Sequence, residues 1–451
     1  MATRTISDAG GNYNNTAAWV EGAVPTSADD VVATATSGNL TINVDSACRS
    51  FDLASYTGAL SHTNGITLSI GDATAGAGGV AIRFGTGMTY PYGGTTSRFS
   101  LVSTAASQQL ISLNGIPVSA FQVPSSVSGA SDVLGSAMTV DNALTIGSGA
   151  FDSAGYGVTC KTFNSNSSVS RSITLGASVL QVTGNSTTLV TLGSGTNADA
   201  LTLSADSATL YLSSTTDTLR GLTLGGKSIG SLKLTSFAGM TTAVRINSSV
   251  TLGKIEVVGN EEMVVTVGAG LTITITGSTS LFPSGSATGL LSMSSLTPTS
   301  PFSISVASGV VSSDYLSLTD CTATGGATFY AGANSADVSG NSGWIFTAPP
   351  APVAAFSATP LSGLAPLSVA FTDASTNTPT SCLWQRSSDG GSNWSTFSTS
   401  QNPTATFTAG TWAVRLTATN ASGSDDETKL AYITVSAAAS GQTGRLLLGL
   451  G

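Results

Sequence analysis

The sequence predicts an all-β protein in which an irregular right-handed parallel β-helix (a β-solenoid) is followed by an immunoglobulin-like β-sandwich. Short runs alternate an apolar residue with Thr or Ser, which is the period of a strand with one buried and one solvated face. Several runs read Leu, Ile or Val, then Thr, then Leu or Ile, then Gly, so one structural unit recurs. Only 9% of the 451 residues are charged, against about a quarter in typical globular proteins. Hydroxyl groups must therefore solvate most of the outer surface.

The predicted solenoid body covers residues 39–346. Its clearest runs are Leu40–Val44, Ile66–Ile70, Ala143–Gly147, Ser172–Gly176, Val190–Gly193, Gly221–Gly225, Val250–Gly253 and Leu271–Ile275. The glycines that end comparable runs are about 17 to 32 residues apart, which excludes a strict hexapeptide or nonapeptide repeat and favours loops of variable length. The less regular segment from Gly85 to Ser131 is interpreted as containing a lateral insertion. A string of antiparallel sandwiches is the alternative fold, but the hairpin turns that it requires are rare here.

Residues 1–38 are predicted to cap the N-terminal end of the solenoid, because an open end would expose unpaired strand edges and an apolar core. Trp19 is expected to cover that end, and Trp344 and Phe346 are expected to close the other. The entry segment joins an aromatic residue, a Pro turn and an Asp-x-Val strand, and the last segment reads Ser-Gly-Asn-Ser-Gly-Trp-Ile-Phe. Both resemble the corresponding parts of β-solenoid proteins of phages and bacterial surfaces. The resemblance implies a structural protein of a phage particle.

Residues 347–352 are rich in Pro and are predicted to form a semi-rigid linker. Residues 353–436 carry six strand-like runs at the spacing of an immunoglobulin-like sandwich. They resemble the PKD (polycystic kidney disease repeat) family at Phe356, Pro360, Gly363, Ala365–Leu367, Phe371–Asp373, Trp384, Asn402–Pro403, Phe407, Gly410–Thr411 and Leu416–Asn420. After Trp384 a longer, Ser-rich hairpin replaces the family's usual Trp-x-Phe-Gly-Asp-Gly. The resemblance implies a spacer or adhesive module without catalytic activity.

Residues 437–451 are predicted to be a flexible tail with an apolar docking end. A tether of Ala, Gly and Ser leads to several leucines, which would be unfavourable if they stayed in water. We expect this end to add a strand to a partner or to fill a groove on it. Folding back onto the sandwich is the alternative. The predicted docking residues are Arg445, Leu446, Leu447, Leu448 and Leu450.

Charge and cysteine content argue against several functions. The net charge is −9 and no basic stripe occurs, so neither nucleic-acid binding nor a polybasic membrane site is expected. No apolar run reaches about 18 residues, so membrane insertion is not expected. The N-terminus lacks the apolar region of a signal peptide, so synthesis in the host cytoplasm is expected. The cysteines are far apart and should be small buried apolar residues, not a zinc site or disulfide framework; they are Cys48, Cys160, Cys321 and Cys382.

No catalytic, metal or cofactor site is predicted. The single histidine, His62, is expected to be a turn residue. A glycosidase would need two carboxyl groups roughly 5 to 9.5 Å apart, but adjacent strand residues point to opposite faces. The candidate carboxylates are Asp29–Asp30, Glu261–Glu262, Asp314 with Asp320, and Asp425–Glu427, and the one cationic cluster is Lys227, Lys233, Arg245 and Lys254. We interpret all of these groups as solvated turn charges.

The sequence thus predicts a non-enzymatic structural protein of a tailed-phage virion. It would be a capsid decoration protein, a head fibre or a tail fibre that projects an adhesive β-rich rod. The expected partners are other virion proteins of the capsid or tail, with host-surface glycans as weak ligands. Whether the chain forms a homotrimer stays open. The alternatives are a polysaccharide-degrading tailspike and a bacterial surface adhesin.

Overall fold

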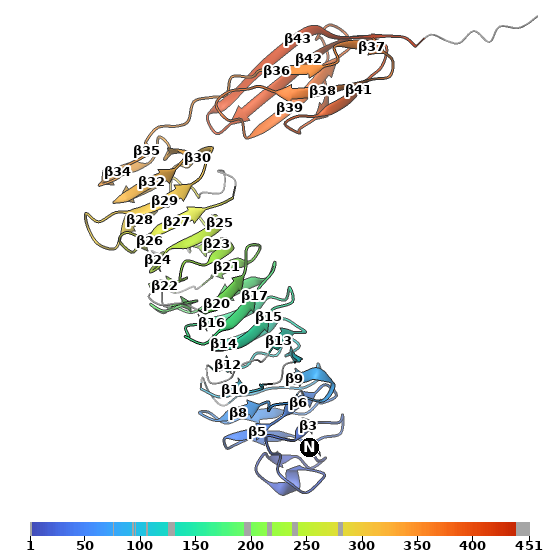
Figure 1. Ribbon diagram of the computed structural model, residues 1–451, viewed down its shortest axis with the longest axis vertical. Coiled ribbons are helices and arrows are strands. Elements are labelled where there is room, and N and C mark those ends of the chain that lie inside the picture. Colours follow the sequence, from blue (N-terminus) through green and yellow to red (C-terminus); the bar gives the residue numbers. More distant parts are fainter. Residues whose placement is uncertain are drawn as a thin grey trace, which may run out of the picture. The chain divides into compact units, whose positions relative to one another are not determined.

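The computed structural model is all-β and divides into two compact units, Met1–Phe346 and Thr347–Gly451 (Figure 1). It describes residues 2–74, 76–92, 94, 96–104, 107–124, 131–193, 200–213, 219–236, 242–277 and 283–438. Within these residues the helical segments are two 3₁₀ turns, η1 (Thr16–Ala18) and η2 (Ala77–Gly79). All eight predicted runs form or overlap strands. The prediction of an all-β chain is therefore confirmed, and the first unit is built from large parallel sheets.

Parallel pairing between strands that lie some distance apart in sequence builds the first unit. Phe302 pairs with Cys321 and Phe51 with Ile82, which are offsets of 19 and 31 residues. One ladder runs through β1 (Thr3–Thr5), β3 (Asp30–Val32), β6 (Ser50–Leu53), β9 (Val80–Phe84), β11 (Gln108–Ser112), β13 (Ser131–Leu134), β15 (Gly149–Asp152), β17 (Arg171–Thr174) and β20 (Leu201–Ser204). The variable offsets arise because loops of different length separate strands that keep the same register.

A second ladder branches where its strands become long enough to pair in two segments. It begins with β5 (Ser46–Cys48), β8 (Thr67–Ile70), β10 (Arg98–Leu101), β12 (Ala120–Val123), β14 (Met138–Ile146) and β16 (Val158–Asn164). One branch continues through β18 (Val179–Val182), β21 (Thr209–Leu212), β23 (Ser228–Thr235), β25 (Val250–Val258), β27 (Thr272–Ile275), β29 (Phe302–Val306) and β32 (Cys321–Gly325). The other continues through β19 (Val190–Thr191), β22 (Arg220–Thr223), β24 (Thr242–Ile246), β26 (Met263–Val267), β28 (Leu291–Ser295), β31 (Leu316–Thr319) and β34 (Ala336–Ser339).

Two short parallel ladders complete the first unit. They are β2 (Gly11–Asn12), β4 (Leu40–Ile42) and β7 (Leu60–His62), and then β30 (Val310–Ser312), β33 (Thr328–Tyr330) and β35 (Trp344–Ile345). Every pairing between these named strands of the first unit is parallel, so the alternative of strung antiparallel sandwiches is wrong for residues 39–346. The predicted lateral insertion is also wrong. Within the irregular segment, β10 pairs with β8 and β12, so this part of the chain belongs to the ladder.

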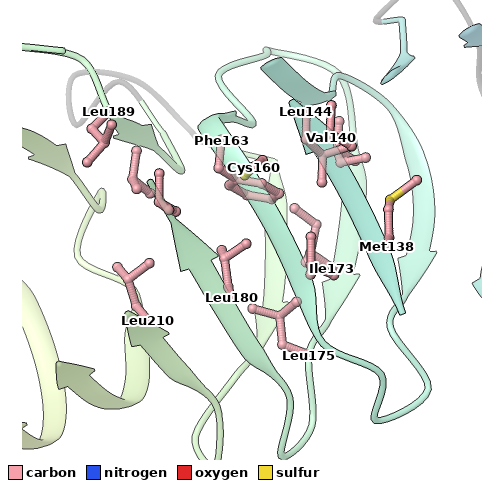
Figure 2. Close-up of a cluster of buried hydrophobic side chains, with 14 of the residues drawn as sticks. Met138, Val140, Leu144, Cys160, Phe163, Ile173, Leu175, Leu180, Leu189 and Leu210 are labelled. Carbon is pink, nitrogen blue, oxygen red and sulfur yellow. The ribbon is translucent and has the colours of Figure 1, made fainter. Parts of the chain in front are cut away.

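Apolar residues align from strand to strand and form buried rows. One such row contains Leu144, Phe163, Val190, Leu222 and Ile246, each paired in register with the next. All five side chains are buried. Figure 2 shows Leu144 and Phe163 beside Leu180 and Ile173, so strands of both large ladders contribute to one apolar interior. Burying each such side chain stabilises the fold by about 1.5–3 kcal/mol, which explains why Leu, Ile and Val alternate with hydroxyl residues.

The second unit consists of two sheets around a separate core. The smaller sheet contains β36 (Phe356–Thr359), β38 (Leu367–Asp373) and β41 (Thr404–Phe407). The larger has the order β37 (Ser362–Leu364), β43 (Gly423–Ser436), β42 (Gly410–Asn420), β39 (Ser381–Ser387) and β40 (Ser395–Ser398). Trp384 is fully buried at 0% exposure and packs against Phe356 and Phe371. The sequence did not predict β40, which pairs with β39 to make the Ser-rich hairpin.

Candidate functional site

His62 is a buried strand residue, so its prediction as a turn residue is wrong. It ends β7, is 1% exposed and lies edge-on to Phe99 with ring centroids 5.1 Å apart. Its Nδ1 is 2.8 Å from the Tyr90 hydroxyl, while Nε2 has no hydrogen-bond partner within the described residues. Burial lowers the pKa of His62 to about 4, although Asp45 and a backbone contact at Ile66 oppose that shift. At neutral pH the imidazole is therefore uncharged and packs among aromatic rings.

This burial predicts that acid destabilises the strands around His62. A pKa of about 4 in the folded state, against about 6.5 for a free imidazole, means that the unfolded chain binds more protons between these values. The contribution is present above pH 6.5 and is lost as pH falls to 4, about 3 kcal/mol in total. The amide protection factors of residues 60–70 in the full-length protein, corrected for the intrinsic pH dependence of exchange, should fall over this range. His62→Gln should remove this fall, and an equal fall in that variant would contradict the assignment.

Two predicted turn carboxylates, Asp29 and Asp30, are instead buried and bonded. Asp29 accepts hydrogen bonds from the backbone amides of Ala2 and Thr26 and from the Thr26 hydroxyl. Burial alone would raise the pKa of Asp29. These hydrogen bonds, together with one from Arg4, outweigh burial, so the pKa of Asp29 is lowered. Asp30 forms an ion pair with Arg49. Both carboxylates thus hold the first strands together, and their interpretation as solvated turn charges is wrong.

Four of the remaining acidic candidates accept hydrogen bonds from backbone amides, namely Asp314, Asp320, Asp425 and Glu427. Asp314 precedes β31, whereas Asp320 lies between β31 and β32, so no single strand contains both. Asp314 accepts hydrogen bonds from Asn334, and Asp320 accepts one from the Thr299 amide. In the second unit, Asp425 and Glu427 accept from the amides of Ala354 and Phe356, respectively. Asp425, Asp426 and Glu427 lie on β43, so their interpretation as turn charges is wrong, whereas Glu261 and Glu262 lie between β25 and β26.

Three of the four predicted cationic residues lie on strands, so their interpretation as turn charges is wrong. Lys233, Arg245 and Lys254 lie on β23, β24 and β25, and only Lys227 precedes a strand. Lys227 donates to the Leu201 carbonyl at 2.8 Å. The sequence could have shown this, because each of the three lies within an alternating apolar run.

The strand cations contribute to a polar row on the outer face of the first unit. The row consists of Gln181, Tyr211, Lys233 and Glu256, paired in register on four successive strands. The Lys233 ammonium lies 5.0 Å from the Tyr211 ring centroid, and Lys254 forms an ion pair with Glu256. The row offers an aromatic ring, an amide and paired charges on a rigid surface. Such a surface can form hydrogen bonds and stacking contacts with a ligand. Its one carboxylate, Glu256, is already paired with Lys254 and is therefore a poor centre for acid–base catalysis.

A more compact cluster lies on the hairpin of the second unit. This hairpin platform consists of Gln385, Trp394, Arg415 and Leu430. Arg415 lies 4.6 Å from the Trp394 ring centroid and donates to the Gln385 Oε1 from Nε at 3.1 Å and from Nη2 at 2.6 Å. Trp394, Arg415 and Gln385 are half-buried, and Leu430 is 63% exposed. The platform brings an indole, a guanidinium and an amide together at the surface.

Asp389 fixes the loop that carries Trp394. Its carboxylate accepts hydrogen bonds from the Ser387 hydroxyl at 2.6 Å and from the backbone amides of Ser392 and Asn393 at 3.0 and 2.9 Å. These bonds, that from Ser387 first, hold the pKa of Asp389 well below its usual range. Gly391 adopts φ 95°, and a Cβ there would lie 3.2 Å from Leu430 and 3.4 Å from Trp394. The loop is thus ordered by its own side chains, and glycine lets Leu430 and Trp394 approach it.

The predicted cap residues pack against other aromatics in the first and last segments of the first unit. Trp19 is buried, meets Tyr13 edge-on at 5.1 Å and donates from Nε1 to the Tyr13 carbonyl. Trp344 is half-buried and meets Phe329 edge-on at 5.1 Å, and Phe346 packs against the same core. Their role as caps stays a prediction. The predicted docking residues Arg445, Leu446, Leu447, Leu448 and Leu450 lie outside the described residues.

The prediction that the cysteines are buried is confirmed for all four, and none of them forms a disulfide in this structure. Burial is the largest cause of the raised pKa of each of these thiols. Within the described residues no group of three or more His, Cys, Asp or Glu side chains is placed to hold a metal ion. Neither 3₁₀ turn of the described chain is long enough to cross a membrane. No family model, curated protein or solved structure matches the chain.

Proposed function

We propose that this protein is a non-enzymatic structural protein of a tailed-phage virion, in which the first unit is an irregular right-handed β-solenoid. The observation that carries the proposal is the in-register parallel pairing that links strands from Thr3 to Ile345. Such a stack buries one continuous core and resists bending because each coil is bonded to its neighbours. Right-handed connections are strongly preferred between parallel strands. A long, rigid element of this kind suits a fibre or a decoration protein.

The second unit fits a PKD-like adhesive or spacer module. Two sheets enclose Trp384, one of the residues that carry the resemblance, and residues 347–352 before this unit's first strand are rich in Pro. The hairpin between β39 and β40 places Trp394 beside Arg415 of the larger sheet, and both residues keep accessible surface for a ligand. We assign attachment to the virion to the apolar residues of the tail. The two units would then present their surfaces to the host. The polar row gives the solenoid a surface for weak glycan contacts.

Incorporation into particles tests the virion role. Quantitative mass spectrometry of purified particles should find the full-length protein at a fixed copy number per particle. A variant without residues 441–451 should be missing from the particles while its circular dichroism spectrum stays unchanged. The matched control is Leu364→Ala, which changes an apolar residue that is 64% exposed on β37 and should be incorporated normally. Absence of the full-length protein from particles would reject the virion role, and incorporation of the truncated chain would reject docking by the tail.

Light scattering of the purified chain separates two forms of the same role. A stable trimer would favour a self-standing fibre, and a monomer would favour a decoration protein that orders on a particle lattice. The proposed structural role survives either outcome. A reducing-end assay on host capsule tests the competing tailspike function, and release of sugar ends would reject the non-enzymatic assignment.

A further inference from the structure

The hairpin platform contains a guanidinium that no carboxylate neutralises within the described residues. Arg415 lies on β42 beside Leu416, whose side chain is fully buried, so Arg415 points away from the core. Its polar contacts within the described residues are the two bonds to Gln385 Oε1, whereas Lys429 on the neighbouring strand pairs with Glu427. A guanidinium has five N–H donors in a planar fork that matches a carboxylate. Donors of Arg415 therefore remain for an anion from outside the chain.

Trp394 also has an unused hydrogen-bond donor, unlike three other tryptophans of the described chain. Trp19, Trp384 and Trp412 each donate the indole N–H to a backbone carbonyl. Trp394 donates to no described protein group, although it is only half-buried on an ordered loop. Its ring meets Arg415, and the residue keeps accessible surface beside that contact. A rigid, partly exposed indole offers a flat apolar surface at low entropic cost.

The neighbours of Arg415 supply further hydrogen-bonding groups in one row. Gln385 and Thr428 pair in register with Arg415 from either side, so an amide, a guanidinium and a hydroxyl lie across three strands. Asp426 faces the same side but lies beyond Thr428, away from the hairpin loop that carries Trp394. A ligand that rests on Trp394 can therefore present its negative group to Arg415 while only its far edge approaches Asp426.

We propose that the hairpin platform binds a carboxylated sugar residue, a uronic acid unit of an acidic polysaccharide. The sugar ring packs its apolar face on Trp394, its carboxylate accepts hydrogen bonds from Arg415, and its hydroxyls bond to Gln385 and Thr428. The planar carboxylate satisfies the guanidinium fork. This inference rests on the proposed adhesive role and gives that role a ligand class. It uses the loop that departs from the PKD pattern, so the resemblance does not supply it.

Saturation-transfer NMR on the full-length protein tests the site with sodium glucuronate and, as the neutral probe, glucose. Millimolar glucuronate should receive saturation from the protein, and glucose at the same concentration should receive several-fold less. Trp394→Ala and Arg415→Gln should each reduce the glucuronate signal about tenfold. Arg415→Lys should also weaken it, because an ammonium keeps the charge but loses the fork. Leu364→Ala, an exposed apolar change on β37, is the matched control and should bind as wild type does.

Three results would overturn the inference. They are the absence of glucuronate saturation in the wild type, equal saturation of glucose, and wild-type binding by both Trp394→Ala and Arg415→Gln. The wild-type comparison of the two sugars needs no variant, so it decides the question even if a variant is unfolded. Failure of this test leaves particle incorporation untouched, and failure of incorporation leaves sugar binding measurable. The two proposals are therefore separated by their readouts.

Discussion

Replacing Phe163 by Ala should lower the free energy of unfolding of the first unit by about 3–5 kcal/mol. Phe163 is 1% exposed on β16 and lies in register between Leu144 and Val190. Truncation removes a buried ring and leaves a cavity that paired strands on both sides cannot close without breaking their register. The loss should be measured by urea denaturation of the full-length protein and by amide hydrogen exchange.

The distribution of the faster amide exchange along the first unit tests whether its strands are stacked as described. Each strand of the ladder pairs only with neighbouring strands, so faster exchange should centre on β14, β16 and β19 and fade with distance along the ladder. Tyr156→Ala is the matched control, because Tyr156 is an aromatic residue seven positions earlier that is 42% exposed. It should change stability by no more than about 0.5 kcal/mol. Uniform acceleration along the first unit, or a loss below about 1 kcal/mol, would contradict the packing described here.

The strands of the first unit were predictable, but their pairing partners were not. Alternation of apolar and hydroxyl residues identifies Leu271–Ile275 as a strand, because burial of one face has a period of two. This strand pairs with β29, in which Ser303 lies opposite Thr272, an offset of 31 residues, and only the assembled ladder shows which loops are long. The segment around Arg98 was misread for the same reason, because a long loop before a strand resembles an insertion. Register is a property of neighbouring strands and leaves little trace in one local sequence.

The hairpin platform was missed because a loop assembles it. Gln385 and Arg415 are 30 positions apart, and Trp394 reaches them through a turn that Asp389 and two glycines define. The departure of residues 384–391 from the PKD pattern marked the place but not the geometry. His62 could have been recognised, because Leu60 and His62 are two apart and share a buried strand face. The residues that follow it, Thr63–Gly65, are typical of a turn, and they led to the prediction of His62 as a turn residue.

Asp132 should make the first unit less stable as the pH rises from about 4 to about 7. Asp132 lies on β13, is 2% exposed, and neither carboxylate oxygen has a hydrogen-bond partner within the described residues. It pairs in register with Gln109 and Phe151. Gln109 binds the Gly76 amide and nearby backbone oxygens instead. Burial raises the pKa of Asp132 to about 7, so the folded chain holds a proton that the unfolded chain releases at about 3.8.

The sign of this effect is opposite to that of His62. Stability from protonated Asp132 is fully present below pH 3.8 and is lost as the pH rises through 7, about 4 kcal/mol in total. Stability from neutral His62 grows between pH 4 and 6.5. The two slopes oppose each other over most of this range, so the wild-type protein should show a shallow pH dependence. Single variants should then reveal steep dependences of opposite sign.

Asp132→Asn separates the two groups, because it keeps the size of the side chain and removes its titration. Urea denaturation of this variant between pH 4 and 7 should show stability that increases with pH, since only the His62 contribution remains of the pair. His62→Gln should show stability that decreases with pH for the complementary reason. Both variants should differ from wild type mainly in the slope of stability against pH. Each substitution replaces a side chain by an uncharged one, and Asp132 and His62 are themselves uncharged at the pH where their contribution to stability is largest. Parallel curves for wild type and Asp132→Asn would mean that the carboxyl is ionised in the fold and has a partner.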